Sequence, residues 1–156
     1  MATCSVDKTV KIWDINEDRC EEPVITFTDI PDFATSIRWS PDGKMIGVVC
    51  KNKAMAYVDP RQEGTAIKAA THTGSRQVRM NWVDGETVLT TGFDQQMKRQ
   101  WGAWDLRNME QPLMLGALPE GSGVSFFHFD REYNIGIMMG RGDNTCPVLS
   151  FNRASP

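Results

Sequence analysis

A histidine, a hydroxyl and an acid occur in an order that could support catalysis: His72, Thr91 and Asp94, followed by Trp104. The same ingredients serve nucleophilic catalysis, in which the acid orients the imidazole and the imidazole activates the hydroxyl. No nucleophile-elbow motif and no turn typical of an oxyanion hole accompanies them. The alternative is a buried polar network in which the Trp104 indole N–H finds an acceptor. We favour the structural interpretation and predict that the chain is not an enzyme.

The strand-like runs that contain these residues belong to a unit that recurs along the chain at a nearly fixed interval. An alternating apolar run closes on an aromatic or branched residue followed by Asp or Asn, with successive spacings of 45, 46 and 47 residues. These closing pairs are Trp13-Asp14, Val58-Asp59, Trp104-Asp105 and Phe151-Asn152. A period of this size that ends on Trp-Asp is the signature of a β-propeller built from four-stranded blades. Such propellers are more often binding platforms than catalysts.

A second element recurs midway between the closing pairs. Strand-like runs enter a turn over residues 36–43, 78–85 and 124–130. The Pro-Asp-Gly and Val-Asp-Gly turns are expected to place Gly43 and Gly85 where the backbone needs a positive φ. Short β-rich runs follow each turn, and no segment has a sustained helical period. These runs are residues 45–50, 87–93 and 135–139.

We therefore predict an all-β fold, a partial WD-repeat β-propeller of about three four-stranded antiparallel blades plus a leading strand. The predicted units are residues 1–14 as the end of one blade, 24–61 as the second blade, 66–107 as the third and 112–153 as the fourth. A closed propeller needs at least about four blades of about 40 to 45 residues each. We therefore expect this chain to be a segment of a larger protein.

In Trp-Asp repeats, a histidine before the first strand, a hydroxyl in the second, an Asp in the next turn and the Trp of the third form a hydrogen-bonded relay. The residues that stand in this order are His72, Thr91, Asp94 and Trp104. Asp7 and Trp13 are interpreted as the surviving half of the preceding relay. A fully paired network of this kind stabilises a blade from within.

The second blade departs from this pattern. It has no histidine before its first strand, no Asp in the turn around Asn52 and no Trp at Val58. Its stability is expected to come from apolar packing of Val48, Met55 and Tyr57.

Composition argues against several classes of site. Zinc needs clustered ligands, whereas the four cysteines are far apart and His72 and His128 are the two histidines. We expect four reduced, mostly buried thiols at Cys4, Cys20, Cys50 and Cys146. No nucleotide-binding glycine motif is present, so no cofactor is predicted. A net charge of -3 without a basic aromatic stripe argues against nucleic acid.

The chain shows no signal peptide and no run of about 18 apolar residues, which predicts a cytoplasmic protein without a membrane span. The tripeptide Arg141-Gly142-Asp143 matches an adhesion motif. We interpret it as a turn.

Residues 89–93 read Leu-Thr-Thr-Gly-Phe, a long polar insertion follows over 94–99, and residues 100–105 read Gln-Trp-Gly-Ala-Trp-Asp. This stretch resembles the coronin family of actin-filament-binding propellers. Further matches in the same order cover essentially residues 1–153, and they correspond to middle and later blades. They fall at residues 59–61, 111–113, 121–124, 134–135 and 140–143.

The resemblance implies binding of F-actin, possible binding of an actin-nucleating complex, and regulation of the actin cytoskeleton. Coronins oligomerise through a coiled coil, and no heptad segment ends this chain. Because actin is acidic, local Lys and Arg patches are the expected contacts. The candidates are Lys51, Lys53, Arg61, Lys98 and Arg99, with the insertion favoured because long loops concentrate binding residues. The alternative is a general WD-repeat scaffold that binds another protein partner in trafficking or complex assembly.

Overall fold

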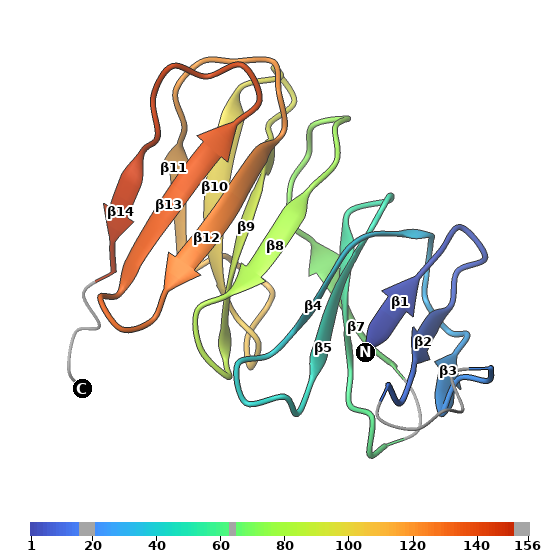
Figure 1. Ribbon diagram of the computed structural model, residues 1–156. Helices are drawn as coiled ribbons and strands as arrows, with labels where there is room; N and C mark the ends of the chain where they lie inside the picture. The colour runs from blue at the N-terminus through green and yellow to red at the C-terminus, as the bar shows by residue number, and fades with distance from the viewer. Residues whose placement is uncertain (16–20, 63–64, 152–156) are drawn as a thin grey trace.

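The chain forms a fan of antiparallel β-sheets in its computed structural model, which describes residues 1–15, 21–62 and 65–151, with the backbone alone for 65–70. Four sheets follow one another in sequence order (Figure 1), and the described residues contain no helix. The first sheet contains β1 (Ala2–Cys4), β2 (Val10–Ile12) and β3 (Ile25–Phe27). The second contains β4 (Ala34–Trp39), β5 (Ile46–Cys50), β6 (Ala54–Val58) and β7 (Thr65–Ala70).

The third and fourth sheets repeat this plan. The third contains β8 (Arg79–Trp82), β9 (Thr87–Phe93), β10 (Arg99–Asp105) and β11 (Met114–Ala117). The fourth contains β12 (Ser125–Asp130), β13 (Ile135–Gly140) and β14 (Val148–Ser150). The predicted all-β, partial propeller fold is thus confirmed.

The sheets divide the chain at different places from the predicted units. β3 was assigned to the unit 24–61, yet it pairs with β2 and closes the first sheet. In the same way β7 and β11 close the sheets that begin with β4 and β8. The sequence repeat ends at the Trp-Asp pair, whereas backbone pairing adds one more strand after it. The predicted period is therefore correct, but its boundaries fall one strand too early.

The pairing registers show which residues are equivalent between sheets. In the second to fourth sheets, one residue of the second strand pairs with an aromatic residue of the first strand and with the closing residue of the third. These rungs are Trp39–Ile46–Val58, Trp82–Val88–Trp104 and Phe129–Gly136–Leu149. Leu149 is therefore the counterpart of Trp104. The predicted closing residue Phe151 lies two positions later, and Asn152 lies outside the described residues.

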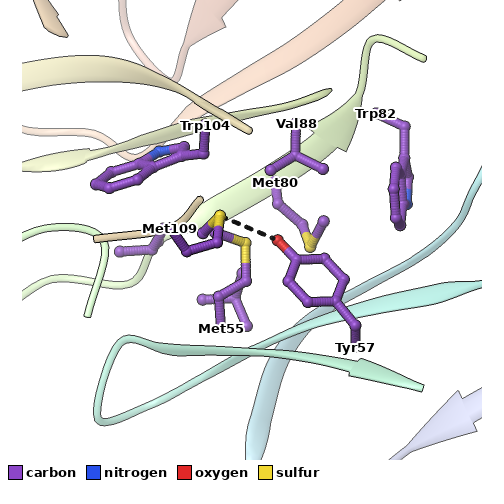
Figure 2. Close-up of a cluster of buried hydrophobic side chains, with 9 residues drawn as sticks. Met55, Tyr57, Met80, Trp82, Val88, Trp104 and Met109 are labelled. Atoms are coloured by element: carbon purple, nitrogen blue, oxygen red, sulfur yellow. Dashed lines mark hydrogen bonds between the residues drawn. The ribbon is translucent and has the colours of Figure 1, made fainter. Parts of the chain in front are cut away.

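The apolar cores lie between neighbouring sheets. One cluster fills the space between the second and third sheets, where the Tyr57 ring meets Trp82 edge-on at 5.9 Å and its hydroxyl contacts the Met109 sulfur at 4.0 Å (Figure 2). Its members are Val49, Met55, Tyr57, Val78, Met80, Trp82, Val88, Trp104 and Met109. Similar clusters join the first sheet to the second and the third to the fourth. As expected, Val48, Met55 and Tyr57 are buried.

The first strands of successive sheets are also tied by side-chain hydrogen bonds to backbone carbonyls. From β8, the Trp82 indole donates to the Arg38 carbonyl of β4 at 3.0 Å. On the other side, the Asn81 amide donates to the Phe127 carbonyl of β12 at 3.1 Å. The third sheet is thereby held between its two neighbours by both apolar packing and directional bonds.

The hairpin turns between first and second strands use two solutions. Gly43 has the predicted positive φ, at 70°. Gly85 does not, so that prediction is wrong. The Asp84 carboxylate instead accepts the N–H groups of Glu86 and Thr87 at 2.8 and 2.7 Å, which closes the turn by side-chain bonding. In the part of the chain that the structure describes, no helix could span a membrane.

Candidate functional site

The third sheet contains a buried polar relay centred on Thr90. The Thr90 hydroxyl lies 2.8 Å from His72 Nε2 and accepts the indole N–H of Trp104 at 2.7 Å. It can donate its own proton to the Gly102 carbonyl at 3.4 Å. The Gln100 amide lies 2.9 Å from His72 Nδ1. With Gln100 as donor to Nδ1, His72 carries its proton on Nε2 and every polar atom of the relay is paired.

Burial determines the charge state of this relay. His72, Thr90 and Trp104 are all at most 4% exposed. Desolvation, with a smaller contribution from the charge of Lys53, lowers the pKa of His72 to about 4. The imidazole is therefore neutral near pH 7. The central hydroxyl is fully enclosed and out of reach of a substrate, which supports the structural interpretation.

The relay differs from the predicted one at two positions. Thr91 points to the opposite face of β9 from Thr90, because side chains alternate along a strand. Its hydroxyl donates to the Ser125 carbonyl of the fourth sheet at 2.7 Å. Asp94 accepts the N–H groups of Gln96 and Lys98 at 2.8 Å each, so it caps the β9–β10 turn. Gln100 holds the place at the imidazole that the sequence interpretation gave to Asp94.

The first sheet keeps the indole–hydroxyl half of the relay. The Trp13 indole donates to the Thr3 hydroxyl at 2.7 Å. Asp7 accepts the backbone N–H and the hydroxyl of Thr9 at 3.0 and 2.8 Å. Asp7 is thus a turn residue, as Asp94 is, and its predicted relay role is wrong.

The candidate lysines Lys51, Lys53 and Lys98 lie in the β5–β6 and β9–β10 turns, which join the two middle strands of the second and third sheets. These two turns and the corresponding β1–β2 and β13–β14 turns each contain one residue with a positive φ: Lys53, Met97, Lys8 and Gly142. The turns of the second to fourth sheets lie towards the top in Figure 1. Lys51 and Lys98 are exposed and Lys53 is partly exposed. This end of the sheets therefore presents ammonium groups to solvent.

Local contacts hold two of these lysines without neutralising them. The Lys51 ammonium lies 4.9 Å from the centroid of the Phe33 ring, and Lys53 Nζ donates to the Thr73 carbonyl at 3.3 Å. Within the described residues, Lys51, Lys53 and Lys98 form no ion pair. Their charges remain available to a partner.

Arg99 does not belong to this exposed set. It is 3% exposed and begins β10, because the predicted insertion is a tight turn closed by the Asp94–Lys98 backbone bond at 2.9 Å. Its guanidinium makes a bidentate ion pair with Asp143 and donates to the carbonyls of Glu120 and Gly121 and to the Ser125 hydroxyl. Arg99 therefore joins the third sheet to the fourth, which contradicts its predicted role in partner contact.

The same contact explains the adhesion-like tripeptide. Asp143 is the carboxylate that Arg99 holds, and the pairing lowers the pKa of Asp143. Gly142 has a φ of 84°, so this segment is a turn whose acid is already engaged.

Arg61 lies at the opposite end of β6 from Lys53 and is neutralised locally. Its guanidinium donates to both carboxylate oxygens of Asp59, two residues earlier, at 2.9 and 2.8 Å. This bonding lowers the pKa of Asp59 to about 2. Arg107 repeats the arrangement with Asp105. Arg61 thus presents a paired charge, unlike the lysines of the turns.

The three cysteines within the described residues differ in environment. Cys50 is buried, Cys4 is half-buried and Cys146 is exposed. The expectation of mostly buried thiols is therefore wrong for Cys146, and Cys20 lies outside the described residues.

No family model matches the chain. Among solved structures, the WD40 domain of Toxoplasma gondii coronin matches over 99% of the chain, with a TM-score of 0.88 and 26% sequence identity. The chain is a coronin-like segment of a WD-repeat propeller. This segment spans 40% of the length of the matched structure, and its fold is typical of a protein-interaction domain rather than an enzyme.

Proposed function

We propose that this chain contributes to the filament-binding surface of a coronin-like, cytoplasmic protein that regulates the actin cytoskeleton. The observation that carries the proposal is the match to a coronin WD40 domain over 99% of the chain at a TM-score of 0.88. It agrees with the coronin-like motifs of residues 89–105. F-actin is the proposed partner, and an actin-nucleating complex is a further partner that the resemblance implies.

The proposed contact surface is the end of the sheets that carries Lys51, Lys53 and Lys98. The two turns concerned join the middle strands of adjacent sheets, and both lie towards the upper end of their sheets in Figure 1. Unpaired cations at this end complement an acidic filament and raise its association rate. Arg61 is a weaker candidate because Asp59 neutralises it.

Cosedimentation of the full-length protein with actin filaments at several salt concentrations tests this proposal. We expect binding that weakens with salt, because exposed charges are screened. The double substitution Lys51→Glu and Lys98→Glu is expected to weaken binding by roughly tenfold or more. Lys44→Glu is the matched control, since Lys44 is 62% exposed and lies at the opposite end of β5 from Lys51.

The outcomes separate the surface from the function. Absence of pelleting at every ionic strength would remove the actin proposal. Equal loss of binding in Lys44→Glu and in the double variant would reject the assignment of the surface while leaving the partner in place.

A further inference from the structure

A hollow of about 360 Å³ opens between the β9–β10 turn, which carries Lys98, and the connection that follows β11. Apolar side chains from the β9–β10 turn and from the end of β11 form its walls, with cations beside and beneath them. The lining residues are Met97, Lys98, Arg99, Ala117, Leu118, Glu120 and Gly121. Met97 is 39% exposed, and its φ of 63° fixes it at the tip of the turn. The hollow therefore has the size and lining to receive one apolar side chain.

A row of cations leads up to this hollow along the connection between β7 and β8. Lys53 donates to the Thr73 carbonyl of this connection at 3.3 Å. Two residues later the Ser75 hydroxyl contacts the Met97 sulfur at 3.5 Å. These contacts make the surface continuous from the second sheet to the edge of the hollow.

Arg76 extends this row and was not among the candidates of the sequence interpretation. Its side chain is exposed, and its guanidinium lies 5.6 Å from the centroid of the buried Phe93 ring. Stacking on a ring restrains the side chain while leaving its charge unneutralised. Phe93 directly precedes the turn that carries Lys98. Arg76 and Lys98 thus flank the same turn.

We propose that Lys53, Arg76 and Lys98, together with the hollow beside Met97, form a docking site for an acidic segment of a partner protein that carries one apolar side chain. The carboxylates of the segment pair with the three cations, and its apolar side chain enters between Met97 and Leu118. The inference rests on the chain being a protein-binding platform, as proposed above, and not on the identity of the filament.

Glu120 sets the direction of the segment. Glu120 is exposed and lines the hollow from the β11–β12 connection, across from the β9–β10 turn, and its carbonyl accepts a hydrogen bond from Arg99 at 3.2 Å. An acidic residue next to Glu120 would be repelled. The acidic part of the segment therefore lies on the Arg76 side, and the apolar residue occupies the hollow at its end.

The test uses the full-length protein and a fluorescent peptide of acidic residues that ends in a leucine. Fluorescence anisotropy should show binding that weakens by about tenfold or more when this leucine is replaced by serine, since the leucine side chain is no longer buried in the hollow. Arg76→Glu should weaken the binding of both peptides by about tenfold or more. Glu120→Gln should strengthen binding by a few-fold.

A blocking variant isolates the hollow. Ala117 is exposed and lines the hollow, so Ala117→Trp fills it without entering the core. Met114→Trp is the control, because Met114 lies on the same strand, is 58% exposed and is outside the hollow. We expect Ala117→Trp to abolish the difference between the leucine and serine peptides, and Met114→Trp to preserve it.

Two results would overturn the inference. One is equal affinity of the leucine and serine peptides for the unsubstituted protein. The other is a difference in affinity between the leucine and serine peptides that is the same in Ala117→Trp as in Met114→Trp. Failure to bind actin filaments, with peptide binding as described, would instead reject the proposed partner and leave the docking site standing.

Discussion

The second and third sheets have the same four-stranded order, yet they fill one equivalent pair of positions in opposite ways. In the third sheet the pair is Thr90 and Trp104, linked by a hydrogen bond and extended to His72. The registers place Val48 and Val58 at these positions in the second sheet, where both are 0% exposed. A blade of this propeller can therefore be held by a polar relay or by apolar packing alone.

The two solutions fail in different ways. When a buried apolar side chain is truncated, the loss of stability grows with the volume that is removed. Neighbouring side chains can move into part of the space and reduce this loss. A relay loses more when one member is removed, because the remaining polar atoms stay buried without partners. The relay, whose hydrogen bonds depend on exact positions of its atoms, lies in the third sheet. This sheet is joined to the fourth by the ion pair of Arg99 with Asp143.

The largest expected effect is therefore truncation of the relay tryptophan. Trp104→Ala should lower the free energy of unfolding by about 3–5 kcal/mol, from lost packing and from the loss of one hydrogen bond to the buried Thr90 hydroxyl. Val58→Ala, at the equivalent position, should cost about 2 kcal/mol. Urea denaturation of the full-length protein, followed by tryptophan fluorescence and circular dichroism, measures both. Equal losses would mean that the relay adds nothing to packing.

The pH dependence of stability distinguishes the two sheets next. The folded pKa of His72 is about 4, below its ordinary value of 6.5, so the unfolded chain takes up the proton first as the pH falls. Stability should therefore decrease between about pH 6.5 and pH 4, by about 3 kcal/mol in total. The second sheet has no buried histidine at this place and adds no such dependence.

The control for this prediction is His72→Gln, which keeps a polar side chain but cannot take up a proton in this range. The difference in unfolding free energy between the two proteins should narrow as the pH falls towards 4. A difference that stays constant with pH would show that His72 is not buried in its neutral form.

The comparison also shows where sequence reasoning succeeds. The repeat period, the all-β class and the run 87–93 follow from alternation and turn residues, because these patterns are local. The apolar character of the second sheet followed from the absence of His, Asp and Trp at the repeat positions. These features depend on residue type alone.

The errors arose where two neighbouring residues of similar type differ only in direction. Thr90 and Thr91 are adjacent hydroxyls, and pairing register alone decides which one faces His72. Lys98 and Arg99 are adjacent cations, and the end of the turn decides which one is buried. Nothing in the sequence indicated that Gln100 contacts His72, because glutamine is also common at exposed positions. Each of these choices is made by the register in which β9 pairs with its neighbouring strands and by the end of the β9–β10 turn.

Replacing each threonine separately sharpens this point. Thr90→Val should cost about 1–3 kcal/mol, because His72 Nε2 and the Trp104 indole both lose a partner. Thr91→Val should cost about 1 kcal/mol, because Thr91 donates to a single carbonyl. Chemical denaturation of the two variants in parallel provides the measurement. A larger loss for Thr91→Val would restore the relay as the sequence interpretation had it.

The smallest expected effect comes from placing the relay hydroxyl in the apolar sheet. Val48→Thr conserves volume and buries a hydroxyl that can donate to the Ala56 carbonyl, the counterpart of Gly102 in the pairing register. It gains neither an imidazole nor an indole, so its oxygen keeps buried lone pairs, and the variant should lose about 1 kcal/mol. Thermal unfolding of the full-length protein detects this difference as a fall in Tm of a few degrees. A gain in stability would show that the second sheet accommodates a buried hydroxyl at position 48. Packing would then not explain why the two sheets differ at this position.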